Sequence, residues 1–157
     1  MKYVVELRKL SQRESVLLRI ICARKVRHDP FDANRLEPRQ HRERVGYGGT
    51  HTARKTGERI GVVPAGYADG VPRALSNLGH VIVAGLSCPI VGAVSMDSMT
   101  IDLTACPTAA VGSDVLIYGR HGDWDVPLEE VAQAIGTIPY ELMIRRGPRV
   151  QRILTRH

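Results

Sequence analysis

The chain has 157 residues, of which 43% are hydrophobic, 24% are charged and 4% are aromatic. This composition excludes a disordered or fibrous protein and suits one domain with a hydrophobic core. The formal net charge of +6 would ordinarily indicate an anionic partner such as nucleic acid or lipid headgroups. All of this excess lies in residues 1–44, which contain 12 basic residues (Lys and Arg) and 6 acidic ones (Asp and Glu). Residues 45–157 contain 10 basic and 10 acidic residues and are therefore neutral.

The first residues, taken in chain order, predict a basic leader over residues 1–44. Leucines and an isoleucine recur at helical spacings within residues 3–27, between Arg and Lys side chains. Such a segment forms a surface helix with one apolar stripe, binds a membrane surface or a partner, or has no stable structure. Residues 28–44 are rich in charge and poor in large apolar residues, so we expect a linker or a disordered segment there.

Residues 45–157 have a different pattern, with short apolar runs separated by Gly, Pro, Asn and Asp about every ten residues. This spacing predicts a mainly β domain, a small antiparallel barrel or sandwich. One short helix is predicted after Asp125, which would cap it, with its end at Gly136. The predicted strands are Ile60–Val63, Val81–Ala84, Ile90–Val94, Met99–Leu103, Val115–Tyr118, Tyr140–Ile144 and Val150–Leu154.

Several features bear on the compartment. No apolar run approaches the roughly 20 residues needed to span a bilayer, and the charged N-terminal residues do not form a secretory signal. Three widely spaced cysteines, Cys22, Cys88 and Cys106, argue against a disulfide framework or a CxxC metal site. We therefore expect a reduced, cytoplasmic setting with no membrane association and no metal.

Candidate chemistry lies mainly with tyrosines, because the sequence contains no GxxxxGK, GxSxG or HExxH motif. Glycines flank Tyr47 and let the backbone bring its hydroxyl close to a ligand. Tyr67 lies in a second glycine-containing turn, and Tyr140 follows a proline. A phenol acts as a general base only where a cation or hydrogen bond favours its ionised form. Judged alone, Tyr47 and Tyr67 are therefore more simply interpreted as residues that anchor turns by their ring and hydroxyl than as bases. Met96 and Asp97 follow an apolar strand, at a strand end where sites often form.

Six motifs occur in one fixed order. They are Val45-Gly46-Tyr47-Gly48-Gly49-Thr50, Gly66-Tyr67-Ala68-Asp69-Gly70-Val71-Pro72-Arg73, Pro89-Ile90-Val91-Gly92 leading to Met96-Asp97, Gly119-Arg120-His121-Gly122-Asp123, Thr137-Ile138-Pro139-Tyr140-Glu141 and Gly147-Pro148-Arg149-Val150. Together they resemble the C-terminal domain of bacterial alanine racemases, which use pyridoxal 5'-phosphate. The resemblance covers about residues 45–157 and implies a cytoplasmic enzyme that interconverts L- and D-alanine to supply D-alanine for the cell wall.

The resemblance also implies a role for each candidate residue. Tyr47 matches the tyrosine base on one face of the substrate Cα, opposite the lysine that carries the cofactor. Met96, with Asp97 beside it, matches the residue whose backbone helps to hold the substrate carboxylate. Tyr67 matches a tyrosine that lines the pocket, and Tyr140 matches one that donates to the cofactor phosphate. Because the family's tyrosine base reaches the partner subunit's cofactor, a homodimer is implied.

The family's N-terminal barrel, with its Schiff-base lysine motif, has no counterpart in this sequence. Gly46, Ser95 and Gln151 also replace the family's usual Ser, Cys and Pro. We therefore expect a racemase fragment, from a truncated or rearranged gene, that is inactive alone and needs a complementing barrel domain. The alternative hypothesis is a non-catalytic β-domain binding module with a basic, anion-binding tail; the neutral β domain itself gives no reason to expect nucleic-acid binding.

Overall fold

The structure, a computed structural model, describes residues 3–7, 9–10, 13–14, 16–19, 38–39, 44–52 and 58–154. The strands are β1 (Tyr3–Leu7), β2 (Lys9–Leu10), β3 (Arg13–Glu14), β4 (Val16–Arg19), β5 (Pro38–Arg39), β6 (Arg44–Val45), β7 (His51–Thr52), β8 (Glu58–Val63), β9 (His80–Val83), β10 (Leu86–Pro89), β11 (Met99–Asp102), β12 (Val115–His121), β13 (Trp124–Val126) and β14 (Val150–Leu154). The helices are α1 (Leu128–Ala134) and α2 (Pro139–Ile144), and two 3₁₀ turns span Tyr67–Asp69 and Arg73–Leu75.

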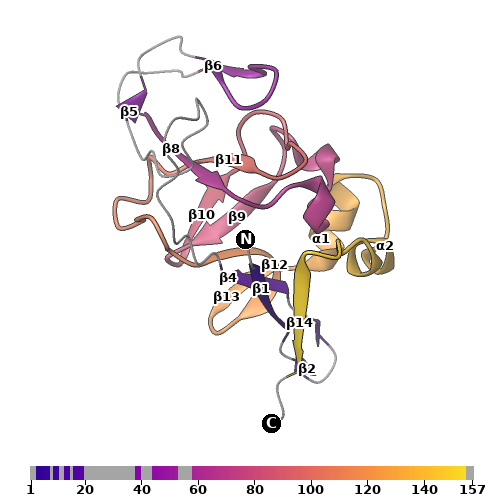
Figure 1. Ribbon diagram of the computed structural model, residues 1–157. Helices are drawn as coiled ribbons and strands as arrows, with labels where there is room; N and C mark the ends of the chain where they lie inside the picture. The colour runs from indigo at the N-terminus through magenta and orange to yellow at the C-terminus, as the bar shows by residue number, and fades with distance from the viewer. Residues whose placement is uncertain are drawn as a thin grey trace.

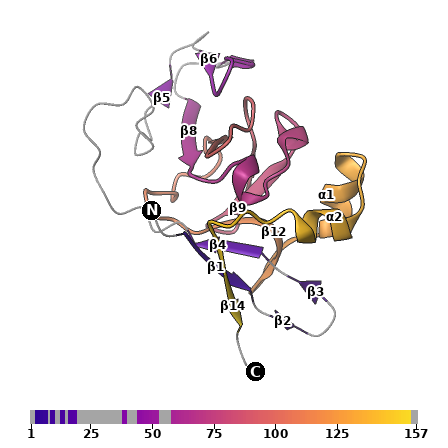
Figure 2. The same ribbon diagram turned by 45° about the vertical axis from the view of Figure 1, so that its right-hand side comes forward.

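A curled sheet organises the fold. Its strands follow the order β10-β9-β12-β4-β1-β14, and β13 pairs with the end of β12. All neighbours are antiparallel except β1 and β14, which are parallel. A second sheet, in the order β11-β8-β5, lies beside β9 and β10 in both views (Figures 1 and 2). A bridge between Ile90 and Ile101 joins the end of β10 to β11. This half-barrel confirms the predicted mainly β fold.

The hydrophobic core draws side chains from both sheets and both helices. Along β11, Met99 and Ile101 are buried while the residues between and after them are half-buried, as expected for a strand with one face on the core. Leu142 of α2 is fully buried in the same cluster. A smaller cluster joins Val45, two residues before Tyr47, to Ile60 and Val91, and so anchors the segment that leads into Tyr47.

The helix predicted within residues 3–27 is wrong for the described part of that range, which forms β1 to β4. β1 pairs with β14, and β4 pairs with both β1 and β12. The short, β-branched run at Tyr3–Val5 suits a strand, and pairing with an existing sheet outweighs a weak helical period. Residues 20–37 and 40–43 lie outside the described residues. The boundary expected between residues 44 and 45 stays a prediction.

Other predicted elements meet different outcomes. The strands expected around β8, β9, β11, β12 and β14 are confirmed, with ends shifted by a few residues. Ile90–Val94 is not a strand, because Gly92 adopts a left-handed φ of 81° that breaks the extended run. Tyr140–Ile144 is helix α2 rather than a strand, because Pro139 occupies its first turn, where the fixed φ of proline suits a helix. Helix α1 begins after Pro127, not Asp125, which lies in β13.

Helix length bears on the expectation about membranes. No helix in the described ranges is long and apolar enough to cross a membrane.

The buried phenol of Tyr118 leads to a prediction about stability at high pH. Burial raises the pKa of Tyr118 from 10.0 to about 12. Between these values the native state keeps a proton that the unfolded state has lost, so the free energy of unfolding falls as pH rises, by about 3 kcal/mol in total. Urea unfolding between pH 8 and 11 should show about half of this fall in the wild type, because the rest comes at higher pH, and a smaller fall in Tyr118→Phe.

The exposed Tyr67 supplies the control, since Tyr67→Phe should keep the wild-type pH dependence. Burial also raises the pKa of the Cys88 thiol from 9.0 to about 11, so part of the fall begins above pH 9 and persists in Tyr118→Phe. An equally steep fall in Tyr118→Phe and the wild type would contradict this assignment.

Candidate functional site

The turn that carries Tyr67 and the turn that carries Met96 are packed backbone against backbone. The amide of Tyr67 donates to the carbonyl of Ser95, and the amide of Ala68 donates to the carbonyl of Met96, each at 3.0 Å. A Cβ at Gly66 would lie 2.2 Å from the Ser95 carbonyl oxygen, so only glycine permits this approach. Two of the motifs singled out in the sequence are therefore held together in space.

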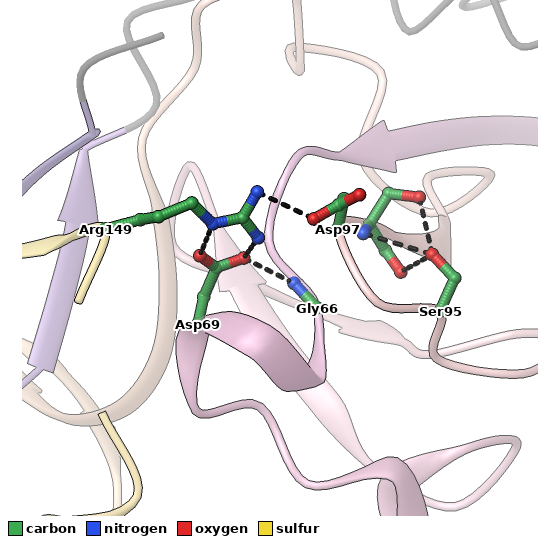
Figure 3. A network of polar contacts seen from close by, with 6 residues as sticks. Gly66, Asp69, Ser95, Asp97 and Arg149 are labelled. Atoms are coloured by element: carbon green, nitrogen blue, oxygen red, sulfur yellow. Dashed lines mark hydrogen bonds and ion pairs between the residues drawn. The ribbon is translucent and has the colours of Figure 1, made fainter. Parts of the chain in front are cut away.

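Arg149 joins these two turns to the segment that precedes β14 (Figure 3). Its Nε donates to Asp69 Oδ1 at 3.0 Å, its Nη2 donates to Asp69 Oδ2 at 2.9 Å, and its Nη1 lies 2.6 Å from Asp97 Oδ1. The Gly66 amide donates to Asp69 Oδ2 at 3.0 Å. The buried Asp69 carboxylate thus has a bidentate cation and a backbone donor, which is what a buried charge requires.

Charge balance around Arg149 follows from the same contacts. Partial burial lowers the pKa of the guanidinium, but the carboxylates of Asp69 and Asp97 outweigh this and leave the pKa above its usual value. The cation is therefore permanent, and the network stays charged wherever the carboxylates are ionised.

Tyr47 is fixed by its backbone while its side chain remains 64% exposed. It lies within the tight turn that the Gly49 amide closes on the Gly46 carbonyl, and it forms an antiparallel bridge with Ala93. The Asn77 side chain contacts the segments on both sides of this bridge. Its Oδ1 accepts from the Gly92 amide at 2.6 Å, next to Ala93, and its Nδ2 donates to Thr50 Oγ1 at 3.3 Å, in the segment that follows Tyr47. The phenol is thus presented from a well-supported backbone toward open space.

Tyr47 and Asp97 line the same hollow, which has a volume of about 230 Å³. Its lining residues are Gly46, Tyr47, Val62, Ala93, Ser95, Asp97, Ser98, Met99 and Thr100. Asp97 is the only charged residue among them, and a carboxylate does not stabilise a phenolate. The cation that a tyrosine base needs is therefore not supplied by the described residues that line this hollow.

The other candidate residues lie outside this hollow. Tyr67 lines a second hollow of about 380 Å³ together with Arg73 and Arg145, and the Arg145 guanidinium forms an ion pair with Glu141. Tyr140, on α2, is 74% exposed and lines neither hollow. Met96 is also exposed, and its carbonyl accepts the bond from the Ala68 amide.

The structure also identifies residues to which sequence reasoning gave no role, namely Asp69, Asn77 and Arg149. Asp69 and Arg149 both stand inside motifs that were singled out, between glycines and prolines. For Asp69 and Arg149, the sequence signal that could have been used is a charged residue within a motif of glycines and prolines. Asn77 has a left-handed φ of 56°, as expected for an asparagine in a turn.

A pyridoxal phosphate cofactor would be only partly accommodated by these residues. Tyr140 offers an exposed hydroxyl to a phosphate group. No lysine is among residues 44–52 and 58–150, whose side chains the structure describes, so they include no amine for a Schiff base. Nor do three His, Cys, Asp or Glu side chains gather there in a way that could hold a metal ion.

Comparison with protein families and sequences gives a consistent result. Residues 35–154 match the family model described as "Alanine racemase, C-terminal domain". The chain is 50% identical over 110 residues to alanine racemase from Cupriavidus necator, covering 68% of this chain and 28% of that protein. It is 43% identical over 113 residues to a catabolic alanine racemase from Salmonella typhimurium, covering 72% and 30%. The chain thus spans less than a third of the length of these relatives.

Solved structures agree with the sequence relatives. Alanine racemase from Acinetobacter baumannii superimposes with a TM-score of 0.72 at 34% identity, over 90% of this chain and 35% of that one. Alanine racemase from Bartonella henselae, solved with covalently bound pyridoxal phosphate, gives a TM-score of 0.68 at 36% identity, over 76% and 32%. The likeness therefore covers most of this chain and about a third of each solved chain.

Proposed function

Because the chain belongs to the alanine racemase C-terminal domain family, we propose that it forms the β domain of a cytoplasmic alanine racemase and supplies Tyr47 as an acid–base residue. The observation that carries this proposal is the shared hollow of Tyr47 and Asp97, beside the turn of Met96. There the exposed Tyr47 hydroxyl, which can donate or accept a proton, shares a hollow with Asp97, the residue that follows Met96.

Racemisation of alanine moves one proton at the Cα atom. As a phenolate, the exposed Tyr47 side chain accepts that proton from one face of Cα, and as a phenol it returns a proton to the same face, while the fixed backbone keeps its oxygen in place. The proton on the opposite face is exchanged by a group outside residues 44–52 and 58–150. Pyridoxal phosphate, when bound, supplies the electron sink that makes such a proton removable. Its amine attachment must come from a residue outside 44–52 and 58–150, which contain no lysine.

Met96 is the residue that we assign to the substrate carboxylate. Its carbonyl is already used by the Ala68 amide. Its own amide has no acceptor among the described residues, so that N–H is available to donate to an oxygen of the substrate. The hydrogen bond from the Ala68 amide fixes the backbone at Met96 and so sets the direction of the Met96 N–H. Such a fixed donor can orient the substrate without taking part in the proton transfer.

The described residues that line the Tyr47 hollow include no Lys or Arg, and this supports a partner surface at Tyr47. The exposed Tyr47, Met96 and Tyr140, together with Ile138 and Ile144 near α2, are large hydrophobic side chains with high exposure. A second copy of the chain, a complementing barrel domain, or both would cover them and would bring a Lys or Arg to the phenol. The homodimer implied by the resemblance is part of this proposal.

The proposal is tested by reconstitution. The chain is mixed with pyridoxal phosphate and the part of the Cupriavidus necator racemase that it does not match, and loss of optical rotation from L-alanine is followed. We expect racemisation, and about a 10²- to 10⁴-fold lower kcat with Tyr47→Phe, the range that acid–base residues contribute. Tyr118→Phe, a matched change in the core, should keep wild-type activity at neutral pH.

Full-length Cupriavidus necator racemase is the positive control, and size-exclusion chromatography shows whether the two parts bind. A stable complex that does not racemise alanine, or a Tyr47→Phe complex as active as the wild type, would refute the proposed role.

A further inference from the structure

Building on the function proposed above, we propose that Arg149 is a positioning residue for that site, which holds the Met96–Asp97 turn in place through its contact with Asp97. The anchor of this arrangement is Asp69. Its side chain is only 3% exposed and is fixed by the Gly66 amide. Asp97 is 60% exposed and lies at the other end of the guanidinium.

Arg149 transmits position because its donors are coplanar and rigidly linked. Two of them, on Nε and Nη2, are taken by the two oxygens of Asp69, which fixes the plane of the guanidinium. The third, on Nη1, then points in a set direction, where it meets Asp97 at 2.6 Å. The buried carboxylate thus determines where the exposed one is held.

The contacts around Asp97 show why this hold matters. Ser95 and Ser98 close their turn through their own hydrogen bonds, with Ser95 Oγ 2.9 Å from the Ser98 carbonyl and 3.1 Å from the Ser98 amide. Ser95 and Met96 are further held by the two amides of the Tyr67 turn. Among the described residues, Arg149 is the polar partner of the Asp97 carboxylate, so it controls the part of the turn that directly follows the Met96 amide.

Lysine cannot replace this function. An ammonium keeps the positive charge and can pair with Asp69. Its donors all lie on one nitrogen, so it lacks the planar fork that binds both oxygens of one carboxylate and also directs an N–H to a second carboxylate. Arg149→Lys therefore separates the geometry of the guanidinium from its charge. Asp97→Ala removes only the exposed end, in a residue whose side chain is not needed for the core.

The first experiment measures hydrogen exchange in the full chain. The Tyr67 and Ala68 amides report on the contact between the two turns, because they bond to Ser95 and Met96. We expect exchange at these amides to be at least about tenfold faster in Arg149→Lys and Asp97→Ala than in the wild type, with amides of β12 unchanged. Asp123→Ala, the same change at an exposed hairpin residue, is the matched control and should leave both sets unchanged.

The second experiment uses the reconstituted racemase. Displacement of the carboxylate-binding amide should raise KM for alanine about tenfold in both variants while kcat stays within about threefold, as expected for lost binding common to substrate and transition state. A merely structural effect would reduce the amount of active complex, and so the apparent kcat, without changing KM.

The outcomes separate the two proposals. Unchanged exchange in Asp97→Ala and Arg149→Lys overturns the role of Arg149, whether or not the wild type racemises alanine. Faster exchange with an unchanged KM also overturns it. A wild-type complex without racemisation overturns the proposed function, and the exchange measurement still decides whether Arg149 holds the turn.

Discussion

Gly147→Ala is expected to prevent the chain from adopting the packing described above. A Cβ at Gly147 would lie 1.7 Å from the carbonyl oxygen of Ala68 and 2.9 Å from its carbonyl carbon. The obstacle is backbone, and that backbone is itself held by the bond from the Ala68 amide to Met96. We expect a loss of more than about 4 kcal/mol in the free energy of unfolding, a large part of a domain's total stability.

Urea unfolding and the soluble yield measure this effect, and Gly61→Ala provides a control with a different obstacle. A Cβ at Gly61 would lie 2.7 Å from Leu103 Cδ1, the tip of a side chain that can move aside. The loss there should be about 1–2 kcal/mol, as for ordinary overpacking. Equal losses in the two alanine variants would contradict the explanation by a backbone crossing.

The strands were predictable where alternation and burial coincide. Met99 and Ile101 are buried on β11 while Thr100 between them is half-buried, so a period of two in the sequence corresponds to a real face of a sheet. The same reasoning failed at residues 140–144, where four of the five residues are apolar but do not alternate with polar ones. There only Leu142 is buried, and the residues at both ends of the segment are exposed.

That failure has a local cause. Five residues are too few to separate a period of 2 from a period of 3.6, so the apolar pattern cannot decide between strand and helix. The decisive residue is Pro139, which occupies the first turn of α2 and has a φ suited to it.

The site was predictable only in part. Tyr47, Tyr67, Met96 and Asp97 could be chosen as candidates because each stands in a motif whose glycines or strand ends are visible locally, and their roles remain predictions. The pairing of Arg149 with Asp69 spans 80 positions in the chain, and no local pattern encodes a contact at that separation. Fold topology alone brings the segment before β14 onto the turns of Tyr67 and Met96.

Asp69→Asn is expected to destabilise the chain by about 3 kcal/mol, near the lower end of the range for breaking a buried ion pair. The amide keeps an acceptor for the Gly66 amide, but it cannot accept a bidentate guanidinium on two charged oxygens. The loss stays near the lower end because the Arg149 side chain is 37% exposed and can be hydrated in the variant.

Asp97→Asn is the matched comparison, since the same change is made at the other carboxylate that contacts the same guanidinium. Asp97 is 60% exposed, so its ion pair is screened by water and should contribute less than about 1 kcal/mol. Urea unfolding of the two variants, each with and without Arg149→Ala, gives the two coupling energies. Because the buried pair is shielded from salt, only the Asp97 coupling should weaken in 1 M NaCl. Equal couplings, or equal sensitivity to salt, would contradict the division of Arg149 between a buried anchor and an exposed carboxylate, and with it the view that Asp69 fixes the direction in which Asp97 is held.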